Sequence, residues 1–503
     1  ADGLGAGMVP PCLEAAVSWR AFLTDRQNPL SGLKPLELSW DALGGPQDAV
    51  LGLGTPSVSF AALQSWLGCG VEIYDPADRL VWWGWVEKVS QTFGATGLES
   101  SLEDLANRAA VRYRSMEPGK DFGTLTQTAW KDEPTSQAFY GIKERLIHQD
   151  LLSEQQALLL RDASLRRWAL PSRRLTPSLT STGIRVSCRG WFGRMRWRQW
   201  QAHTDILGHS PAQQGFQALG ASLAQSFTPA EAGSLAALNA RIRKIGNPQD
   251  SLRFQIRTDS LGQPGGAVLA EAALPASAIS GESYAWVSLW LSQPCPIAAG
   301  QKHWLVISRD GAANPAAYYS LGVDENLGFP GGKLLLLDAS TGQWKPRSPE
   351  ADLLFKLTML SDSAELMARV AETAACFSGF DYEAGSGFSL PYVSESGLDC
   401  QEEFLRLLRL GTPSLENLLA WVTPKRRLRV FTMPEANSAE FWLGKDGRIK
   451  AGDGRNLEAP WQAVGTWLRS ETGADCFVEN LRLHIPDQSY RLRTTSVDYV
   501  PSA

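Results

Sequence analysis

The sequence predicts a multidomain fold that is mainly β with some α. At 503 residues the chain is too long for one ordinary hydrophobic core. Short alternating apolar segments, separated by turns rich in glycine and proline, recur along most of its length, whereas segments with helical periodicity are few. A hydrophobic content of 44% and a charged content of 20% are ordinary for a globular protein and exclude wholesale disorder.

The first predicted domain spans residues 1–116 and is organised around a β-hairpin at residues 66–89. Val71–Tyr74 reads as one strand and Leu80–Val89 as the other, with Asp75-Pro76-Ala77-Asp78 as the turn. The second strand carries Trp82, Trp83 and Trp85, so both faces of the hairpin must be covered. The spacing of Ser100 and Glu103 is that of a capping box and predicts a short helix reaching residue 109.

Residues 117–183 are predicted to form a helical insertion, and residues 184–202 to return and complete the first domain. Ser153 and Gln156 have capping-box spacing at the start of an amphipathic helix. The run from Trp191 to Trp200 reads as a strand. In that strand Arg194, Arg196 and Arg198 would share one face, with Met195 and Trp197 on the other.

Residues 203–215 read as a linker, and residues 216–358 as a β-sandwich or jelly-roll domain made of short alternating strands. Trp286, Trp290 and Trp304 lie inside these strands and are expected in the core. Four other aromatic residues fall in predicted loops, where they would either contact sugar rings or pack against a neighbouring domain. These are Tyr284, Tyr318, Tyr319 and Trp344.

The last segment, residues 359–503, is predicted to be mixed α/β. Helices are expected at 363–376, at 404–410 after a cap formed by Asp399 and Glu402, and at 414–422. Leu428–Met433 reads as a strand. The turn expected at residues 445–448 would begin another hairpin.

Sequence patterns give no support for catalysis, a cofactor or a metal. The five histidines include no pair at metal-ligand spacing, and neither a nucleophile elbow nor a P-loop is present. Glu402/Glu403 and Asp324/Glu325 could be imagined as acid–base pairs, but capping and solvation account for them. The seven cysteines are scattered and read as small buried hydrophobes of a chain folded in a reducing cytoplasm. We therefore expect no enzyme and no cofactor.

Arginine is concentrated between residues 161 and 198, a stretch that contains ten arginines and a single acidic residue, Asp162. Such a cluster either pairs with acids of a neighbouring domain or subunit, or contacts a nucleic-acid backbone. A second basic run at residues 425–429, which includes Arg426 and Arg427, has the same two readings. The net charge of −5 argues against a protein that coats nucleic acid along its whole surface.

No apolar run is long enough to cross a bilayer, and the first residues do not have the pattern of a secretory signal. We therefore expect no membrane segment and interpret the N-terminus as a flexible lead-in.

Loose motifs in the first and last thirds, taken in order, resemble the tail-tip hub or minor tail proteins of long-tailed bacteriophages, a group related to baseplate hubs. In the first third the resemblance rests on Trp66-Leu-Gly, Val71-Glu-Ile-Tyr, Trp83-Gly-Trp-Val, Ser101-Leu-Glu-Asp-Leu-Ala-Asn-Arg, Thr128-Ala-Trp, Ser136-Gln-Ala-Phe-Tyr-Gly-Ile-Lys-Glu and Val186-Ser-Cys-Arg-Gly-Trp-Phe. In the last third it rests on Glu403-Phe-Leu-Arg-Leu-Leu-Arg-Leu-Gly-Thr, Arg427-Leu-Arg-Val-Phe and Asp446-Gly-Arg-Ile.

The resemblance implies two tube-like β-barrel domains per subunit and a homotrimer at the tail tip of a phage or phage-derived particle, made in the host cytoplasm. Its partners would be the tail tube and other tail-tip proteins. Arg194, Arg196, Arg198, Arg426 and Arg427 would then face a subunit interface or the channel through which genomic DNA passes. The inserted domain resembles carbohydrate-binding modules and could contact host glycans. The alternative is a carbohydrate-binding or glycan-processing protein whose working part is the 216–358 sandwich.

Overall fold

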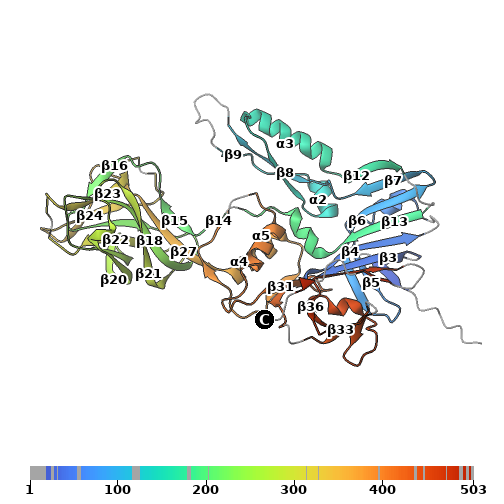
Figure 1. The fold of residues 1–503 in the computed structure, drawn as a ribbon. Coiled ribbons are helices and arrows are strands. Elements are labelled where there is room, and N and C mark those ends of the chain that lie inside the picture. The colour runs from blue at the N-terminus through green and yellow to red at the C-terminus, as the bar shows by residue number, and fades with distance from the viewer. Residues whose placement is uncertain are drawn as a thin grey trace, which may run out of the picture. The chain divides into compact units, whose positions relative to one another are not determined.

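The computed structural model confirms a multidomain protein that is mainly β with some α (Figure 1). Strands hold 50% of its residues and helices 14%, and its sheets include two half-barrels. The structure describes residues 19–23, 28–30, 32–53, 58–115, 125–177, 183–201, 203–312, 314–326, 328–394, 397–435, 439–445, 448–471, 473–485, 491–493 and 498–499. The N-terminal lead-in, Cys12 and part of the expected 445–448 turn lie outside these ranges.

The chain forms two compact units whose boundaries differ from the predicted domains. Unit 1 comprises residues 1–200, 367–387 and 397–503, and unit 2 comprises residues 201–366 and 388–396. The first and last thirds, assigned to separate domains from the sequence, therefore belong to one unit. Unit 2 begins before residue 216 and ends after residue 358, so it extends past both limits of the predicted sandwich domain.

Unit 1 is built on a large sheet with the strand order β2-β1-β5-β6-β13-β4-β3-β37-β38. The predicted hairpin is confirmed as β5 and β6, joined across the Asp75–Asp78 turn. Strand β13 returns between β6 and β4. The strands are β1 (Arg20–Leu23), β2 (Asn28–Pro29), β3 (Lys34–Asp41), β4 (Leu43–Leu53), β5 (Gly70–Tyr74), β6 (Leu80–Phe93), β13 (Gly183–Arg189), β37 (Asn480–His484) and β38 (Arg491–Arg493), with the short helix α1 (Phe60–Gln64) before β5.

The hairpin tryptophans are all buried. Trp82, Trp83 and Trp85 are 0%, 9% and 1% exposed. The Trp83 indole N–H donates to the carbonyl of Val422, at 3.0 Å, so a hairpin near the start of the chain is tied to a strand near its end. Burying three indoles in one strand removes several hundred Å² of apolar surface from water, which makes this hairpin a principal part of the core.

Strands from the last third complete the same sheet. Strand β37 pairs antiparallel with β3, and β31 (Leu418–Val422) runs parallel to β4 and pairs with β32 (Arg427–Thr432), which pairs with β28 (Gly379–Tyr382). The helix predicted at 414–422 is therefore wrong. A short apolar run such as Leu418-Leu-Ala-Trp-Val is compatible with a buried strand as well as a helix. Here it forms a strand because it can pair with the edge of β4.

The segment predicted to be a helical insertion is mixed rather than helical. Strand β8 (Arg108–Arg114) pairs with β9 (Leu125–Gln127), β10 (Lys131–Asp132) and β11 (Glu144–His148), and β12 (Ser172–Pro177) pairs with β7 (Thr96–Ser101). The helices are α2 (Pro134–Tyr140) and α3 (Glu154–Trp168), and α3 begins at the predicted Ser153–Gln156 capping box. It packs on the β8 sheet through Ala157, Val111 and Tyr113 (Figure 1).

Two further predictions for the first 200 residues are wrong. The stretch from Ser100 to residue 109 is the end of β7, a turn and the start of β8 rather than a helix, because β7 continues its pairing with β6 as far as Ser101. Residues Trp191–Trp197 form a 3₁₀ helix, not a strand. Arg194, Arg196 and Arg198 therefore do not share a strand face.

The remainder of unit 1 comes from the last third of the chain. Helix α5 (Cys400–Leu408) begins at Asp399 with a complete capping box to Glu402, as predicted, and α4 (Ser363–Ala374) belongs to this unit from Met367 onward. A five-stranded sheet in the order β34-β33-β35-β36-β39 follows. Its strands are β33 (Phe441–Leu443), β34 (Ile449–Ala451), β35 (Trp467–Ser470), β36 (Asp475–Phe477) and β39 (Asp498–Tyr499).

Unit 2 is a sandwich of two antiparallel sheets. One has the order β15-β27-β18-β23-β16 with β21, β26 and β29 attached, and the other has the order β20-β19-β22-β17-β24-β25. Their facing sides share one core, in which Phe254, Tyr319 and Phe355 are fully buried. The first sheet contains β15 (Ile206–His209), β16 (Gly215–Ala218), β18 (Gly233–Ile245), β21 (Ala285–Ile297), β23 (Tyr318–Asp324), β26 (Asp352–Leu353), β27 (Phe355–Asp362) and β29 (Ser389–Leu390). The second contains β17 (Ser222–Phe227), β19 (Leu252–Ser260), β20 (Gln263–Leu274), β22 (His303–Arg309), β24 (Leu334–Asp338) and β25 (Gln343–Pro346).

The predicted linker, residues 203–215, is part of this unit. Strand β14 (His203–Thr204) pairs with β30 (Val393–Ser394), and β15 pairs with β27. The Asp205 carboxylate accepts hydrogen bonds from Ser361 Oγ at 2.8 Å and from the Tyr392 N–H at 2.7 Å. This buried acid therefore joins three distant segments that composition alone marked as loop.

Asp41, at the end of β3, gives a testable pH dependence. Burial, partly opposed by the hydrogen bond that the Leu43 N–H donates to Oδ1 at 2.7 Å and assisted by nearby Glu479, raises the pKa of its carboxyl to about 6. Between the ordinary pKa, near 3.8, and about 6 the folded state holds more protons than the unfolded state, so stability falls as pH rises through this window.

We expect Asp41→Asn to raise the free energy of unfolding at pH 7 by about 1–2 kcal/mol and to flatten the pH dependence between pH 4 and 6. The amide oxygen can still accept from Leu43, so the turn is retained. Urea denaturation at pH 4, 5, 6 and 7 measures both effects. A variant less stable than the parent at pH 7 would contradict the expectation.

Candidate functional site

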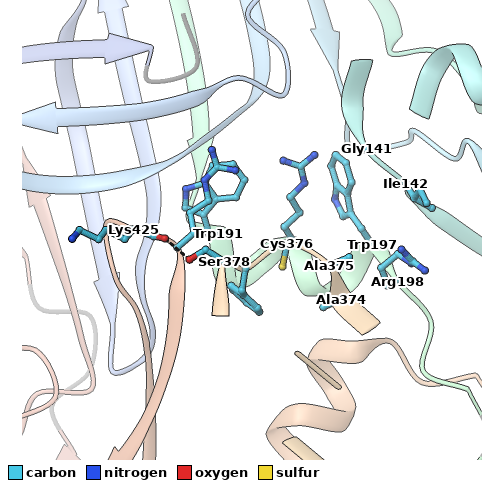
Figure 2. A pocket seen from close by; sticks show the side chains of 13 residues that line it. Gly141, Ile142, Trp191, Trp197, Arg198, Ala374, Ala375, Cys376, Ser378 and Lys425 are labelled. Atoms are coloured by element: carbon cyan, nitrogen blue, oxygen red, sulfur yellow. Dashed lines mark hydrogen bonds between the residues drawn. The ribbon is translucent and has the colours of Figure 1, made fainter. Parts of the chain in front are cut away.

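The candidate site is a cavity of about 490 Å³ within unit 1. Three segments supply its walls: the 3₁₀ helix Trp191–Trp197 with Arg198, the stretch from Ala374 to Ser378 after α4, and the turn that contains Lys425 and Arg426. Gly141 and Ile142, which follow α2, complete it. Figure 2 shows Trp191, Cys376 and Trp197 around this cavity.

Local backbone conformation positions the Lys425–Arg426 turn and Gly141 in the cavity wall. Arg426 adopts φ +59°, so Lys425 and Arg426 lie in a tight turn. The Arg426 N–H donates a hydrogen bond to the Thr423 carbonyl at 2.9 Å. Ser378 fixes this turn from the adjacent segment, since its Oγ donates to the Lys425 carbonyl at 2.6 Å (Figure 2) and its N–H donates to the Arg426 carbonyl. Gly141 has φ +78°, and a Cβ there would lie 2.9 Å from the Arg194 guanidinium.

Arg194 is held by aromatic rings. Its guanidinium lies 4.5 Å from the ring centroid of Trp197 and 5.5 Å from those of Trp85 and Trp191, and it donates a hydrogen bond to the Tyr140 carbonyl. Arg426 lies 4.1 Å from the centroid of Trp191. Each such cation–π contact contributes roughly 0.5–2 kcal/mol, so the two guanidinium groups are fixed rather than freely rotating.

The charge lining the cavity is positive. Four cationic side chains line it, Arg194, Arg198, Lys425 and Arg426, and the lining residues that the structure describes include no carboxylate. Arg198 has a counter-charge nearby, since its Nε lies 3.1 Å from Glu144 Oε1. An anion entering the cavity would meet two guanidinium groups held on aromatic rings, the geometry that favours binding of a planar carboxylate.

Cys376 is the one thiol in the cavity wall. Burial raises the pKa of this thiol to about 12, an effect that Arg194 and Arg426 only partly offset. The thiol is therefore neutral near pH 7, and the thiolate is the form that acts as a nucleophile. The cavity is better suited to binding an anion than to thiolate chemistry.

The structure brings together three of the five arginines singled out from the sequence. Arg194, Arg198 and Arg426 line the cavity, whereas Arg196 and Arg427 do not. Arg196 is exposed on the 3₁₀ helix. Arg427 pairs with Asp381 and Arg429 with Glu383, where β32 runs parallel to β28 and the residue after it, so these two cations are neutralised by the same chain.

Sequence reasoning missed the partners that give the cavity its character. A strand would set Trp197 on the opposite face from Arg194, yet in the 3₁₀ helix the Trp197 ring centroid lies 4.5 Å from that guanidinium. The roles of Gly141 and Cys376 carried no sequence signal, because both depend on contacts between distant segments. The alternation of arginine and tryptophan was the one local hint, and it also fits a strand.

The four aromatic residues predicted to contact sugar are not gathered at one site. Tyr319 is fully buried, and its hydroxyl donates to the Asp250 carbonyl, so the prediction for this residue is wrong. Tyr284 shares a 2.7 Å hydrogen bond with Ser320 Oγ, and Trp344 packs against the small cluster around Trp304. Tyr318 begins strand β23 beside Lys244 and Ile245 of β18.

Six cysteines are described, and all are free thiols. Among the described residues, no group of three or more histidine, cysteine, aspartate or glutamate side chains could hold a metal ion. Every helix in the described part of the chain falls short of the length or apolarity needed to span a membrane.

No family model and no curated protein matches the chain. Among solved structures it is similar to a clostridial cysteine protease, Cwp84, after propeptide cleavage, with 9% identity and a TM-score of 0.23 over 56% of this chain and 72% of that one. It is also similar to the uncharacterized protein lmo2446 from Listeria monocytogenes, with 12% identity and a TM-score of 0.15 over 58% of this chain and 28% of that one. Infectious bursal disease virus provides a third, with 10% identity and a TM-score of 0.14 over 67% and 81%. At these TM-scores the likenesses assign neither a fold family nor a function.

Proposed function

We propose that the protein is a structural component of a phage tail tip, a hub that joins the tail tube to tip and host-attachment proteins as a homotrimer. The ordered motifs of the first and last thirds support this, as does the large sheet that those two parts build together. The observation that carries the proposal is the cavity with fixed guanidinium groups in unit 1, which suits an acidic side chain of a neighbouring protein. In this proposal the protein resides at the virion tail tip, where genomic DNA would pass close to it.

A discrete cavity favours an acidic side chain over a nucleic-acid backbone. Sequence-independent nucleic-acid binding relies on a positively charged groove that follows many phosphates. Here the cationic groups line one cavity of limited size, and several other arginines of the 161–198 cluster already pair within the chain. Arg174 pairs with Asp104, and Arg189 with Glu87 and Asp48.

The proposal predicts that assembly depends on the cavity cations. We expect the double variant Lys425→Gln, Arg426→Gly to lose trimer formation at least tenfold, because it removes both charges of the turn while glycine accepts the positive φ of position 426. Sedimentation velocity over a concentration series measures the assembly, and electron microscopy of the wild-type protein tests for a ring.

The matched control is Arg427→Gln, Arg429→Gln, which also removes two cations but outside the cavity. It should assemble like the parent, since exposed ion pairs contribute little to stability. A wild-type chain that stays monomeric up to its solubility limit, or equal losses in both double variants, would refute the proposal.

A second candidate function is glycan recognition by unit 2. Tyr284, Tyr318, Tyr319 and Trp344 do not form one site, but another feature supports this function: Trp290 lies on a sheet face and is 65% exposed. Exposed indoles that present a flat apolar surface are suited to stacking on one face of a sugar ring. A glycan array probed with the full chain tests this function, and the absence of any bound glycan would exclude it.

A further inference from the structure

The outer face of the first sheet of unit 2 carries an unusual set of side chains. Four strands run side by side here in the order β15-β27-β18-β21. Residues on the inner side of β18, such as Leu238, Ala240 and Ile242, belong to the sandwich core, so the alternate positions point outward. The registers define three outward rows: Ile206–Thr358–Ala237–Trp290, then Gly208–Lys356–Asn239–Ser288, then Arg241–Trp286.

Two tryptophans stand on this face, contrary to the expectation that both are core. Trp286 is 37% exposed and Trp290 is 65% exposed. They occupy positions i and i+4 of one strand, which places their Cα atoms roughly 13–14 Å apart along it. Alternation along a strand identifies two faces but does not show which one is buried, and the sequence-based expectation chose the wrong face for both indoles.

Two cations accompany the tryptophans. Lys356 Nζ lies 4.7 Å from the ring centroid of Trp286, and Arg241 is the cross-strand neighbour of Trp286. Among the residues that the structure describes, no carboxylate lies within ion-pair distance of either cation, and the Arg241 Nε is buried without a hydrogen-bond partner. A guanidinium and an ammonium without a counter-charge beside exposed indoles favour an anionic ligand.

Small polar side chains lie between the two tryptophans. Ser288 Oγ donates to Asn239 Oδ1, and Asn239 Nδ2 donates to the Lys356 carbonyl at 3.3 Å. Between the two indoles, the sheet surface therefore presents the Ser288 hydroxyl and the Asn239 amide. Apolar rings alternating with hydrogen-bonding groups match the alternation of C–H faces and hydroxyls along a sugar chain.

We propose that this face binds an acidic polysaccharide, a glycan chain whose sugars carry carboxylates. Trp290 and Trp286 stack on sugar rings, Arg241 and Lys356 bind the carboxylates, and Ser288 and Asn239 meet hydroxyls. The spacing of the indoles and the open face suit several consecutive sugars rather than a single one. The inference rests on the second proposed function and is independent of the tail-tip assembly.

Affinity electrophoresis of the full chain tests the proposal, with polygalacturonate as the acidic glycan. A neutral glucan, poly-glutamate and a single-stranded DNA oligonucleotide serve as comparison ligands. We expect binding to polygalacturonate to exceed binding to the other three at least tenfold and to weaken with added salt.

Trp290→Ala should reduce binding to polygalacturonate by roughly tenfold, and Lys356→Gln should reduce both the affinity and its salt dependence. Both side chains lie at the surface, so the sandwich should remain folded, which a thermal melt verifies. The matched controls are Trp442→Ala, a partly exposed indole of unit 1, and Lys302→Gln, an exposed cation before β22. Neither control should change binding.

The outcomes separate the two levels of the proposal. Equal binding of the neutral glucan would overturn the acidic specificity and leave glycan recognition standing. Absence of binding to polygalacturonate would overturn the acidic-glycan proposal, and a glycan array without any bound glycan would overturn the second proposed function as well. Equal or stronger binding of poly-glutamate or DNA, or loss of binding in the controls, would show a non-specific cationic surface and refute the site.

Discussion

Replacing Trp85 with alanine is expected to lower the free energy of unfolding by about 3–5 kcal/mol. Trp85 is 1% exposed, its ring packs edge-on against Trp197 with centroids 5.1 Å apart, and Arg194 lies over it. Truncation removes the transfer energy of an indole and leaves a cavity beneath Arg194 that the rigid sheet cannot fill. The loss is comparable to a large part of the stability of a typical domain.

Urea denaturation of the two proteins measures this difference. Trp442→Ala is the matched control, because Trp442 is 38% exposed on β33 and should cost less than about 1 kcal/mol. Trp85→Phe should lie between them, since it keeps a ring in the same space. A loss below about 1 kcal/mol for Trp85→Ala would mean that the hairpin is not a principal part of the core.

Glu144→Ala should have the second largest effect, a loss of about 2–4 kcal/mol. The Glu144 side chain is 6% exposed and connects three groups: its Oε1 lies 3.2 Å from Arg108 Nη1 and 3.1 Å from Arg198 Nε, and its Oε2 accepts from the Gln199 N–H at 2.7 Å. Removing it leaves two largely buried guanidinium groups and one backbone N–H without this acceptor.

Two variants calibrate the Glu144 measurement. Glu144→Gln keeps an acceptor for Gln199 but loses the charge, so its cost should lie below that of alanine. Glu458→Ala removes an acid that is 85% exposed and 3.8 Å from Arg79, and it should change stability by less than about 0.5 kcal/mol. Chemical denaturation that gave equal losses for Glu144→Ala and Glu458→Ala would contradict the structural role of Glu144.

The sequence predicted those parts of the fold that depend on nearby residues. The 66–89 hairpin has its turn, its proline and both strands within 24 positions, and the caps at Ser153 and Asp399 need only four residues each. Arg194, Arg198 and Arg426, which line one cavity, stood out in the sequence because the clustering of like charge is visible along the chain.

The errors arose where distant contacts decide. Gly190 brings the chain so close to Pro46 that a Cβ would lie 1.6 Å from its carbonyl oxygen, and the following residues coil into a 3₁₀ helix rather than extending. Leu418–Val422 is a strand because β4 offers it an edge. Trp290 is exposed because the core of unit 2 lies on the other side of β21, which no local pattern records.

The pairing of β3 with β37 also sets the order in which the chain can finish folding. Glu37 pairs with His484 and Asp41 with Asn480. The edge of β3 therefore stays unpaired until about 440 further residues have been synthesised. At about 5–20 residues per second, synthesis of that stretch takes on the order of 20–90 s. Once β13 has paired with β4 and β6, this sheet keeps an open edge at β3 until β37 is synthesised, which makes the nascent chain a candidate for chaperone binding and for premature pairing with other chains.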